Sequence, residues 1–393
     1  MIVVSGGDLI LPGRVISAGS LIIDGGRVVA VESRRVDPAG ATMIDASDCY
    51  VAPGFIDVHV HGLHGHDTLD GDGAIARIAA LLPRYGVTAF CPTTVACTPE
   101  ALRSVLQQIG QARISPSAGS ARVLPAHLES NFINPEYKGA QPAECLRTAD
   151  DSSRDGVYSG RAILDVIAAC RPDVGIVTMA PELPGGLDLV RTLATAGHRV
   201  ALGHSGSNYD TAIDAIDAGA RHATHLFNRM TPMSHRAPGL PGAVLAREEV
   251  TVELICDGYH VHPSMCRVAM AAKGPEGVMA ITDATSGAGL AVGSTARLGG
   301  RSIEIREHAA FLEDGTLAGS TLTMDRAFRN VVASFGGSLV DAAIVCSTSP
   351  ARALGLNGFG VLAEGTVADL VVMDRAFHVV RTLIGGREAF PAH

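Results

Sequence analysis

Eight apolar stretches of this chain have the composition of buried strands, and each ends in, or leads directly into, a residue able to bind a metal, transfer a proton or line a pocket. The stretches are 51–61, 87–94, 122–129, 174–182, 199–204, 220–225, 251–260 and 277–283. Helical patterns or long loops separate them, and eight strand–helix units on this spacing predict a (β/α)8 barrel. Because the strands of such a barrel end at one rim, we expect these side chains to converge there.

The two ends of the chain differ from this middle part. Residues 1–50 form short alternating segments interrupted by glycine, which is typical of antiparallel strands and hairpins, and residues 351–393 repeat the pattern. Each end is too short to enclose its own core, so we predict that both build one small β-sandwich domain. Residues 51–350 would form the barrel, with an insertion of two or three short strands near 295–318 after the eighth barrel strand.

Composition limits the possible partners and compartment. The formal net charge of −9 argues against a nucleic acid or an anionic membrane as partner, although a local basic pocket for an anionic substrate is compatible with it. The 8 cysteines form no CxxC motif, as expected in a reducing cytosol. The N-terminus lacks the features of a signal peptide, and no apolar run approaches the roughly 20 residues of a membrane span. We therefore expect a cytoplasmic protein.

Histidine pairs of the form HxH provide the first candidate metal ligands. The chain has three such pairs: His59/His61, His64/His66 and His260/His262. A pair alone is weak evidence, because 15 histidines can produce one by chance. Only the first pair ends a long apolar run, and residues i and i+2 share one strand face, so both rings can point to the barrel mouth. We expect the second pair to be solvated in its glycine-rich loop and His262 to be structural.

Three further strand ends complete a candidate metal site. Glu129, His204 and His225 each follow an apolar run, and a buried unpaired acid is costly, so Glu129 should have a metal or cation as partner. Three protein ligands with a position left for water are the pattern of a catalytic zinc site. Histidines earlier in these strands are expected to be structural or to support a ligand: His127, His198 and His222.

The last barrel strand ends in Asp283, which is well placed as a general base that takes a proton from water and returns it to the leaving group. The alternative interpretation is a cap for the following segment. Arg229 and Arg236 lie in the loop after the sixth strand, where their guanidinium groups would suit a phosphate, but they could equally be ordinary surface residues.

Taken together, these motifs resemble the amidohydrolase superfamily and, within it, the N-acetylglucosamine-6-phosphate deacetylases. The matching stretches follow the family order across nearly the whole chain: PGFIDVHVHG, HLESNFINPEYKGAQP, LGHS, THLFNRMTPMSHRAPGLPGAVL, DGYHVHP, ITDAT and LAGSTLTM. HLFN…HRAPG followed by DGYH is specific to the deacetylases, whereas HxH alone would indicate only the superfamily.

The resemblance implies that Glu129, His204 and His225 bind the main metal. It also implies that His59 and His61 could hold a second ion bridged by Glu129, although some family members lack these two histidines. One or two divalent ions per subunit are therefore expected. Zinc is the first expectation, and Fe, Co or Mn would suit histidine and carboxylate ligands as well.

The resemblance also implies the reaction, in which the N-acetyl group of N-acetylglucosamine 6-phosphate is hydrolysed with Asp283 as the acid and base. His260 and Asn228 would line the pocket for the sugar and phosphate, and we add the neighbouring Arg229 to this group. Arg236 resembles an arginine that the family supplies to the phosphate across a dimer interface, so a homodimer is expected.

Two departures from the family pattern bear on the substrate. Ser130 and Asn131 stand where the family usually has Gly-Pro, so the loop after Glu129 is expected to have a different shape. Gln141 stands where the family often has a histidine that contacts the acetyl carbonyl, and an amide can donate a hydrogen bond but cannot become a cation. Either Gln141 suffices, or the acyl group or sugar differs.

Other functions are therefore still considered. One is deacetylation of the galacto epimer. Another is a dihydroorotase-like or acylamino-acid amidohydrolase, which would tend to carry a carboxylated lysine at a neighbouring strand end where this chain has none. A non-catalytic relative would be expected to have lost ligands, and all are present.

Overall fold

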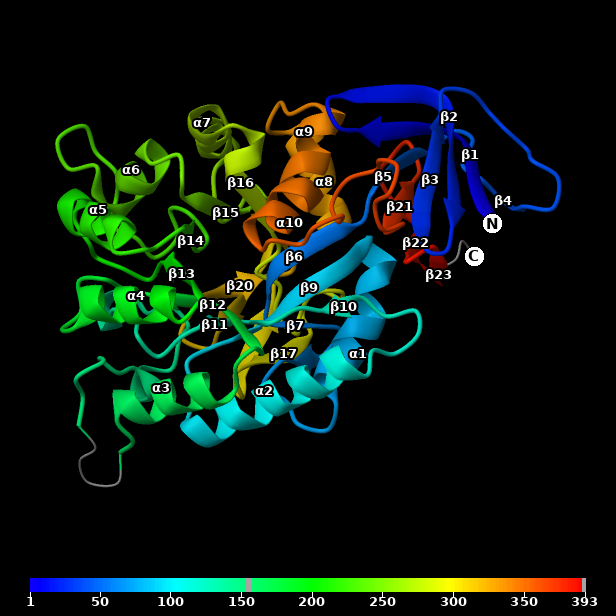
Figure 1. The fold of residues 1–393 in the computed structure, drawn as a ribbon. Coiled ribbons are helices and arrows are strands. Elements are labelled where there is room, and N and C mark those ends of the chain that lie inside the picture. The colour runs from blue at the N-terminus through cyan, green and yellow to red at the C-terminus, as the bar shows by residue number, and fades with distance from the viewer. Residues whose placement is uncertain (153–156, 391–393) are drawn as a thin grey trace.

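The structure is a computed structural model that describes residues 1–152 and 157–390. Its centre is a parallel barrel (Figure 1). Strand β9 pairs with β6 on one side and with β10 and β11 on the other, and β12 to β16 follow β11 in chain order. The strands are β6 (Phe55–Val60), β9 (Val87–Thr94), β10 (Arg122–Val123), β11 (Ala126–Glu129), β12 (Val174–Met179), β13 (Arg199–Leu202), β14 (His222–Ala223), β15 (Thr251–Ile255) and β16 (Val278–Ile281). The predicted (β/α)8 barrel is confirmed.

The barrel closes at the ends of its first and last strands. The backbone N–H of Asp283 donates to the carbonyl of His59 at 3.0 Å, and the N–H of His61 donates to the carbonyl of Ala284 at 2.8 Å. The side chain of Asp57 adds to this junction, because its carboxylate accepts the hydroxyl of Thr282 at 2.6 Å. The segments that carry the first HxH pair and Asp283 are therefore held side by side.

Several strands are shorter than their apolar patterns. Residues 51–61 divide between β5 (Tyr50–Pro53), which leaves the barrel, and β6. In β13, β14 and β16 the ladder stops two residues before the candidate ligand or base. His204, His225 and Asp283 then have left-handed backbones, with φ of 48°, 28° and 50°. Such conformations are uncommon outside glycine, and strained residues of this kind gather at functional sites.

Helices cover the outside of the barrel (Figure 1). They are α1 (Ala74–Leu81), α2 (Pro99–Ile114), α3 (Gly160–Ala169), α4 (Gly186–Thr195), α5 (Tyr209–Asp217), α6 (Gly239–Ala246), α7 (Pro263–Lys273), α8 (Met324–Ala333), α9 (Leu339–Ala343) and α10 (Ser349–Ala353). In α2 the buried side chains recur at the three- and four-residue spacing of one helix face: Leu102, Val105, Leu106 and Ile109. Each buried side chain of this size stabilises the fold by roughly 1.5–3 kcal/mol. Among the described residues, no helix has both the length and the apolar character needed to cross a bilayer.

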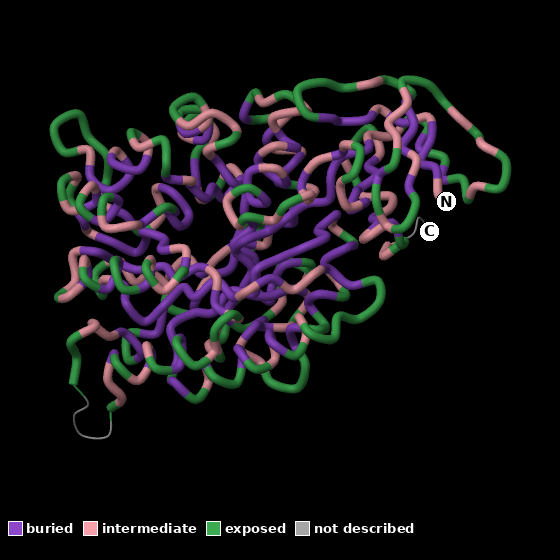
Figure 2. The backbone as a smooth tube through the Cα atoms, in the orientation of Figure 1, coloured by how far each residue is buried: buried purple, intermediate pink, exposed green. Residues whose placement is uncertain are grey.

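Both ends of the chain contribute to a second sheet, as predicted. It contains β1 (Ile2–Leu11), β2 (Arg14–Asp24), β3 (Arg27–Glu32), β4 (Thr42–Asp45), β5, β21 (Leu370–Met373), β22 (Val379–Ile384) and β23 (Arg387–Phe390). The antiparallel pairing of β5 with β21 joins the two ends, and apolar side chains from both enclose a separate core. Figure 2 shows this sheet beside the deeply buried barrel strands. The sheet extends to Pro53 rather than ending at residue 50.

The insertion after β16 forms four antiparallel strands rather than two or three: β17 (Thr295–Leu298), β18 (Arg301–Ile305), β19 (Ala309–Leu312) and β20 (Leu317–Ser320). It attaches to the barrel rim, because the N–H of Ser320 donates to the carbonyl of Asp283 at 2.8 Å. Gly319 has φ +67°, and a Cβ there would lie 3.0 Å from that carbonyl. Glycine therefore permits the close approach of this sheet to the site.

Candidate active site

Three predicted ligands meet at one point on the barrel rim. The Nε2 atoms of His204 and His225 lie 2.9 and 2.8 Å from the same Glu129 oxygen, Oε1, and 3.0 Å from each other. All three side chains are buried, and their ligand atoms lie within 4.8 Å of one another. Glu129 ends β11, while the histidines follow β13 and β14, so the barrel rim brings together side chains far apart in sequence.

The first HxH pair lies on the other side of Glu129. The Nε2 atoms of His59 and His61 are 3.1 Å apart, and His61 Nε2 is 3.5 Å from Glu129 Oε2. His59 Nε2 is 3.8 Å from Oε1 of the same carboxylate. Glu129 thus stands between two groups of ring nitrogens, the position required of a bridging carboxylate.

The hydrogen bonds of two of these rings, His59 and His204, fit metal ligation. His59 Nδ1 donates to a Glu253 oxygen at 2.9 Å, and His204 Nδ1 donates to the carbonyl of Tyr137 at 2.8 Å. A ring that donates through Nδ1 can present the lone pair of Nε2 to a metal when Nε2 carries no proton, so both rings could direct a lone pair to an ion beside Glu129. Such convergence of lone pairs and a carboxylate is stabilised by a cation.

Glu253, on β15, supports the site from a position that the strand-end motifs do not indicate. It is fully buried, accepts from His59 Nδ1 and from His222 Nε2 at 2.8 Å, and accepts the backbone N–H of His225 at 3.1 Å. Burial alone would raise the pKa of Glu253, but the charge of the neighbouring His59 ring and the hydrogen bond from His222 hold it well below its ordinary value. An isolated acid inside the apolar run TVELIC was the available signal, since such an acid needs partners.

The remaining barrel histidines have partners of their own. His127 bonds through Nδ1 to the carbonyl of Val58 at 2.9 Å and through Nε2 to the hydroxyl of Thr178 at 2.7 Å. Burial lowers the pKa of His127 to about 3, which keeps this ring neutral. His198 donates through Nδ1 to the carbonyl of Val174 at 3.0 Å. None of these hydrogen bonds involves Glu129, so His127 and His198 stabilise the barrel around the site.

Asp283 faces the first HxH pair. Its Oδ1 atom lies 3.3 Å from His61 Nε2 and 3.4 Å from His59 Nε2. Burial would raise the pKa of Asp283, but the hydrogen bond from His61 and the charges of both rings lower it below the ordinary value. The group is therefore a carboxylate at neutral pH and able to accept a proton. No helix begins directly after it, so the structure does not use it as a helix cap.

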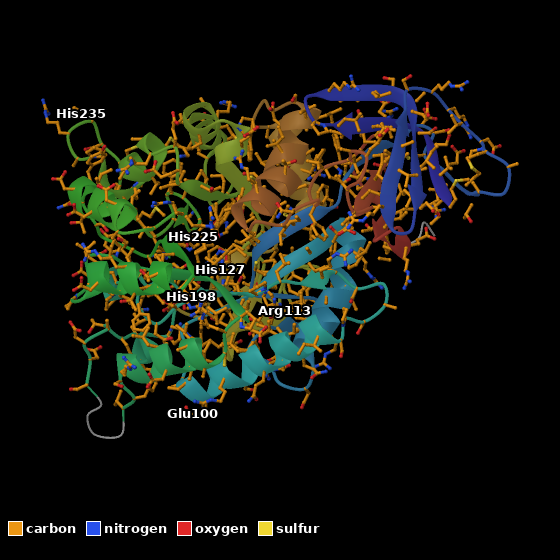
Figure 3. All side chains as sticks on the ribbon, in the orientation of Figure 1. Glu100, Arg113, His127, His198, His225 and His235 are labelled. Atoms are coloured by element: carbon orange, nitrogen blue, oxygen red, sulfur yellow. The ribbon has the colours of Figure 1, made fainter. Side chains whose placement is uncertain are left out.

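A cavity of about 60 Å³ adjoins these groups. Most predicted site residues line it: His61, Glu129, Gln141, His204, His225, Asn228, Arg229, His260 and Asp283. Two do not. His59 is completely buried behind the rim. Arg236 is exposed, and Figure 3 shows its neighbour His235 at the tip of a loop that points away from the barrel.

The three positions that depart from the family pattern are tied into this rim. Neither Ser130 nor Asn131 has a left-handed backbone, and Asn131 Nδ2 donates to the carbonyls of Cys97 and Cys145 at 2.8 and 2.7 Å. Gln141 accepts the N–H of Ala96 at 2.7 Å and donates through Nε2 to Glu129 Oε2. The loop therefore needs no glycine here, and Gln141 is held against a candidate ligand.

Comparison with known proteins agrees with this geometry. A family model described as "Amidohydrolase family" matches residues 50–389. The chain belongs to the amidohydrolase family. This amidohydrolase is 32% identical over 391 residues to the N-acetylglucosamine-6-phosphate deacetylase of Bacillus subtilis, covering 97% of this chain and 95% of that protein. It is 35% identical over 357 residues to the N-acetylgalactosamine-6-phosphate deacetylase of Escherichia coli O157:H7, covering 90% and 91%.

A solved structure extends the likeness to the fold. A mutant of the Mycobacterium smegmatis N-acetyl-D-glucosamine-6-phosphate deacetylase, in complex with N-acetyl-D-glucosamine-6-phosphate, superposes on this amidohydrolase with a TM-score of 0.88. The two chains are 33% identical, and the match covers 99% of each.

Proposed function

We propose that this amidohydrolase removes the acetyl group of N-acetylglucosamine 6-phosphate, giving glucosamine 6-phosphate and acetate in amino-sugar catabolism. The observation that supports it most directly is the buried Glu129–His204–His225 group within one cavity that also presents Asp283 and Arg229. Metal ligands, a proton carrier and a cation for phosphate are the parts that hydrolysis of such an amide requires.

The reaction forms a C–O bond between water and the acetyl carbon and breaks the amide C–N bond. A divalent ion held by Glu129, His204 and His225 would supply Lewis acidity toward the carbonyl and the water. Asp283 takes a proton from the attacking water, because it is ionised and faces the cavity. It then delivers that proton to the departing nitrogen, so one carboxylate serves both halves of the reaction.

We further propose that His59 and His61 hold a second ion and that zinc occupies the first site. Glu129 stands between the two groups of rings, and Glu253 orients His59 from behind. Carboxylates that orient metal-binding histidines in this way raise metal affinity. Metal analysis of the purified protein tests both the number and the identity of the ions.

Asn228, Arg229 and His260 would bind the sugar phosphate in the subunit's own cavity. Arg236 would reach the phosphate of a second subunit in a homodimer, since within one chain it does not line the cavity. We place the protein in the cytoplasm, in keeping with its 8 cysteines, all of which are free.

Acetate release from N-acetylglucosamine 6-phosphate by metal-quantified protein tests the proposal. Its galacto epimer and the unphosphorylated sugar should be measured beside it. The galacto activity is the second candidate, because the Escherichia coli relative with that name is as similar as the others. Fast turnover of the gluco compound alone would support the proposal. A metal-loaded protein that releases no acetate from any of the three would contradict it.

A further inference from the structure

The ring of His260 has one nitrogen that is firmly bonded and one that is not. Nδ1 lies 2.6 Å from Oδ2 of Asp257, and both side chains are almost completely buried, with exposed fractions of 4% and 5%. Nε2 is buried without a hydrogen-bond partner, and the ring lines the substrate cavity. A buried polar atom without a partner is costly, so a bound ligand is the natural partner for Nε2.

Asp257 also fixes the backbone that carries this ring. Its other oxygen, Oδ1, accepts the N–H groups of Tyr259 at 2.8 Å and His260 at 2.9 Å. The carboxylate therefore closes a tight turn after β15 and holds the ring of His260 from the same turn. Because Asp257 does not line the cavity, it can act on a substrate only through His260.

The carboxylate decides where the protons of His260 lie. An ionised carboxylate only accepts hydrogen bonds, so Nδ1 carries a proton and any second proton must be placed on Nε2. With Nδ1 occupied in this way, a proton that accompanies a bound anion can be placed only on Nε2, which would donate it to that anion. The cavity that Nε2 faces also contains Asn228 and Arg229, whose donors suit the same anion.

We infer that Asp257 is a positioning residue, which holds His260 so that Nε2–H is donated to the phosphate of the substrate. The inference rests on the proposed function, because it takes the anion to be that of a sugar phosphate. It adds a residue outside the cavity to those that determine substrate affinity.

The substitution Asp257→Asn tests the contact with the His260 ring while preserving the hydrogen bonds that close the turn. The amide oxygen can still accept the two backbone N–H groups, whereas the NH2 group replaces the oxygen that faces Nδ1. An NH2 group only donates, so Nδ1 must become an acceptor and the ring offers the anion at most a neutral Nε2–H, which is a weaker donor than a charged one. The exposed Asp214 on α5, changed to Asn, is the matched control.

We expect Asp257→Asn to raise KM for N-acetylglucosamine 6-phosphate, and the inhibition constant of inorganic phosphate, by about tenfold or more, with kcat changed less than about threefold. Melting temperature and metal content should match those of Asp214→Asn. In a His260→Ala background the added Asp257→Asn change should have little further effect, because coupled residues are not additive. Nitrogen NMR of the His260 ring should show Nδ1 protonated in the parent protein and unprotonated in Asp257→Asn.

Additive effects of the two substitutions, or an unchanged tautomer, would overturn the inference. An equal loss with unphosphorylated N-acetylglucosamine would assign Nε2 to a sugar hydroxyl and would overturn the phosphate contact. If the parent protein turns over none of the sugars, the proposed function fails. Phosphate binding and the NMR tautomer would then still decide the role of Asp257.

Discussion

At the scale of single residues, the chemistry depends on carboxylates held by histidines. Asp283 is ionised and close to both rings of the first HxH pair, yet it belongs to none of the candidate metal clusters found among the described residues. We expect Asp283→Asn to lower kcat by between about 100-fold and 10,000-fold, the usual contribution of a general acid and base. Metal content measured on the same sample should stay at the level of Asp214→Asn. A variant that keeps more than a tenth of the parent kcat would show that another group carries the proton.

Glu253 is a single buried charge behind the site, and we expect it to contribute both to folding stability and to metal binding. In Glu253→Gln one of the two histidine N–H donors loses its acceptor, because an amide has one acceptor oxygen, and neither His59 nor His222 keeps an ionised partner. We expect the free energy of unfolding to fall by about 3 kcal/mol or more, because breaking a buried charged pair has a cost of this size. Urea denaturation and metal titration should show lower stability together with weaker binding at the His59/His61 site. Unchanged metal affinity would rule out an orienting role.

At the scale of elements, the junction of β6 and β16 depends on a titrating side chain. Burial raises the pKa of Asp57 to about 7 from its ordinary 3.8, even though bonds from Thr282 and His59 oppose the change. Between these values the folded protein keeps a proton that the unfolded chain has lost, so this group's stabilising contribution falls as the pH rises from about 4 to 7. In Asp57→Asn that loss should disappear. The melting temperature of Asp57→Asn, measured from about pH 5 to pH 8 at constant metal loading, should fall less steeply with rising pH than that of the parent protein. Parallel curves would contradict the assignment.

At the scale of the whole molecule, one subunit does not bring all the predicted phosphate ligands together. If Arg236 serves the partner's cavity, a mixed dimer of Arg236→Ala and Asp283→Asn subunits contains one complete site. Co-expression should then restore roughly a quarter of the parent activity, although each variant alone is poorly active. Activity no greater than the sum of the two separate variants would show that Arg236 does not act across an interface.

The predictions made from sequence succeeded where the evidence was local. Apolar runs at strand–helix spacing predicted the barrel, and glycine-broken alternation predicted the terminal sheet. The signal for the start of α2 is equally local, because Thr98 directly precedes Pro99 and its side chain accepts the N–H of Ala101. Ser207 and Asn208 are both suitable cap residues before α5, and the structure uses Asn208, whose side chain accepts the N–H of Thr211. Neighbouring cap residues compete for the same N–H groups, and the sequence does not rank them.

The sequence by itself determined which side chains stand at the strand ends, because the alternation of a strand and the polarity of its last residue are written in consecutive positions. Only the tertiary structure decided which atoms of those side chains are available. Glu253 pairs with His59 from a strand far along the chain, and Asp257 binds Nδ1 of His260, which leaves Nε2 without a partner. Such bonds join residues whose distance is set by barrel closure, so no local pattern contains them.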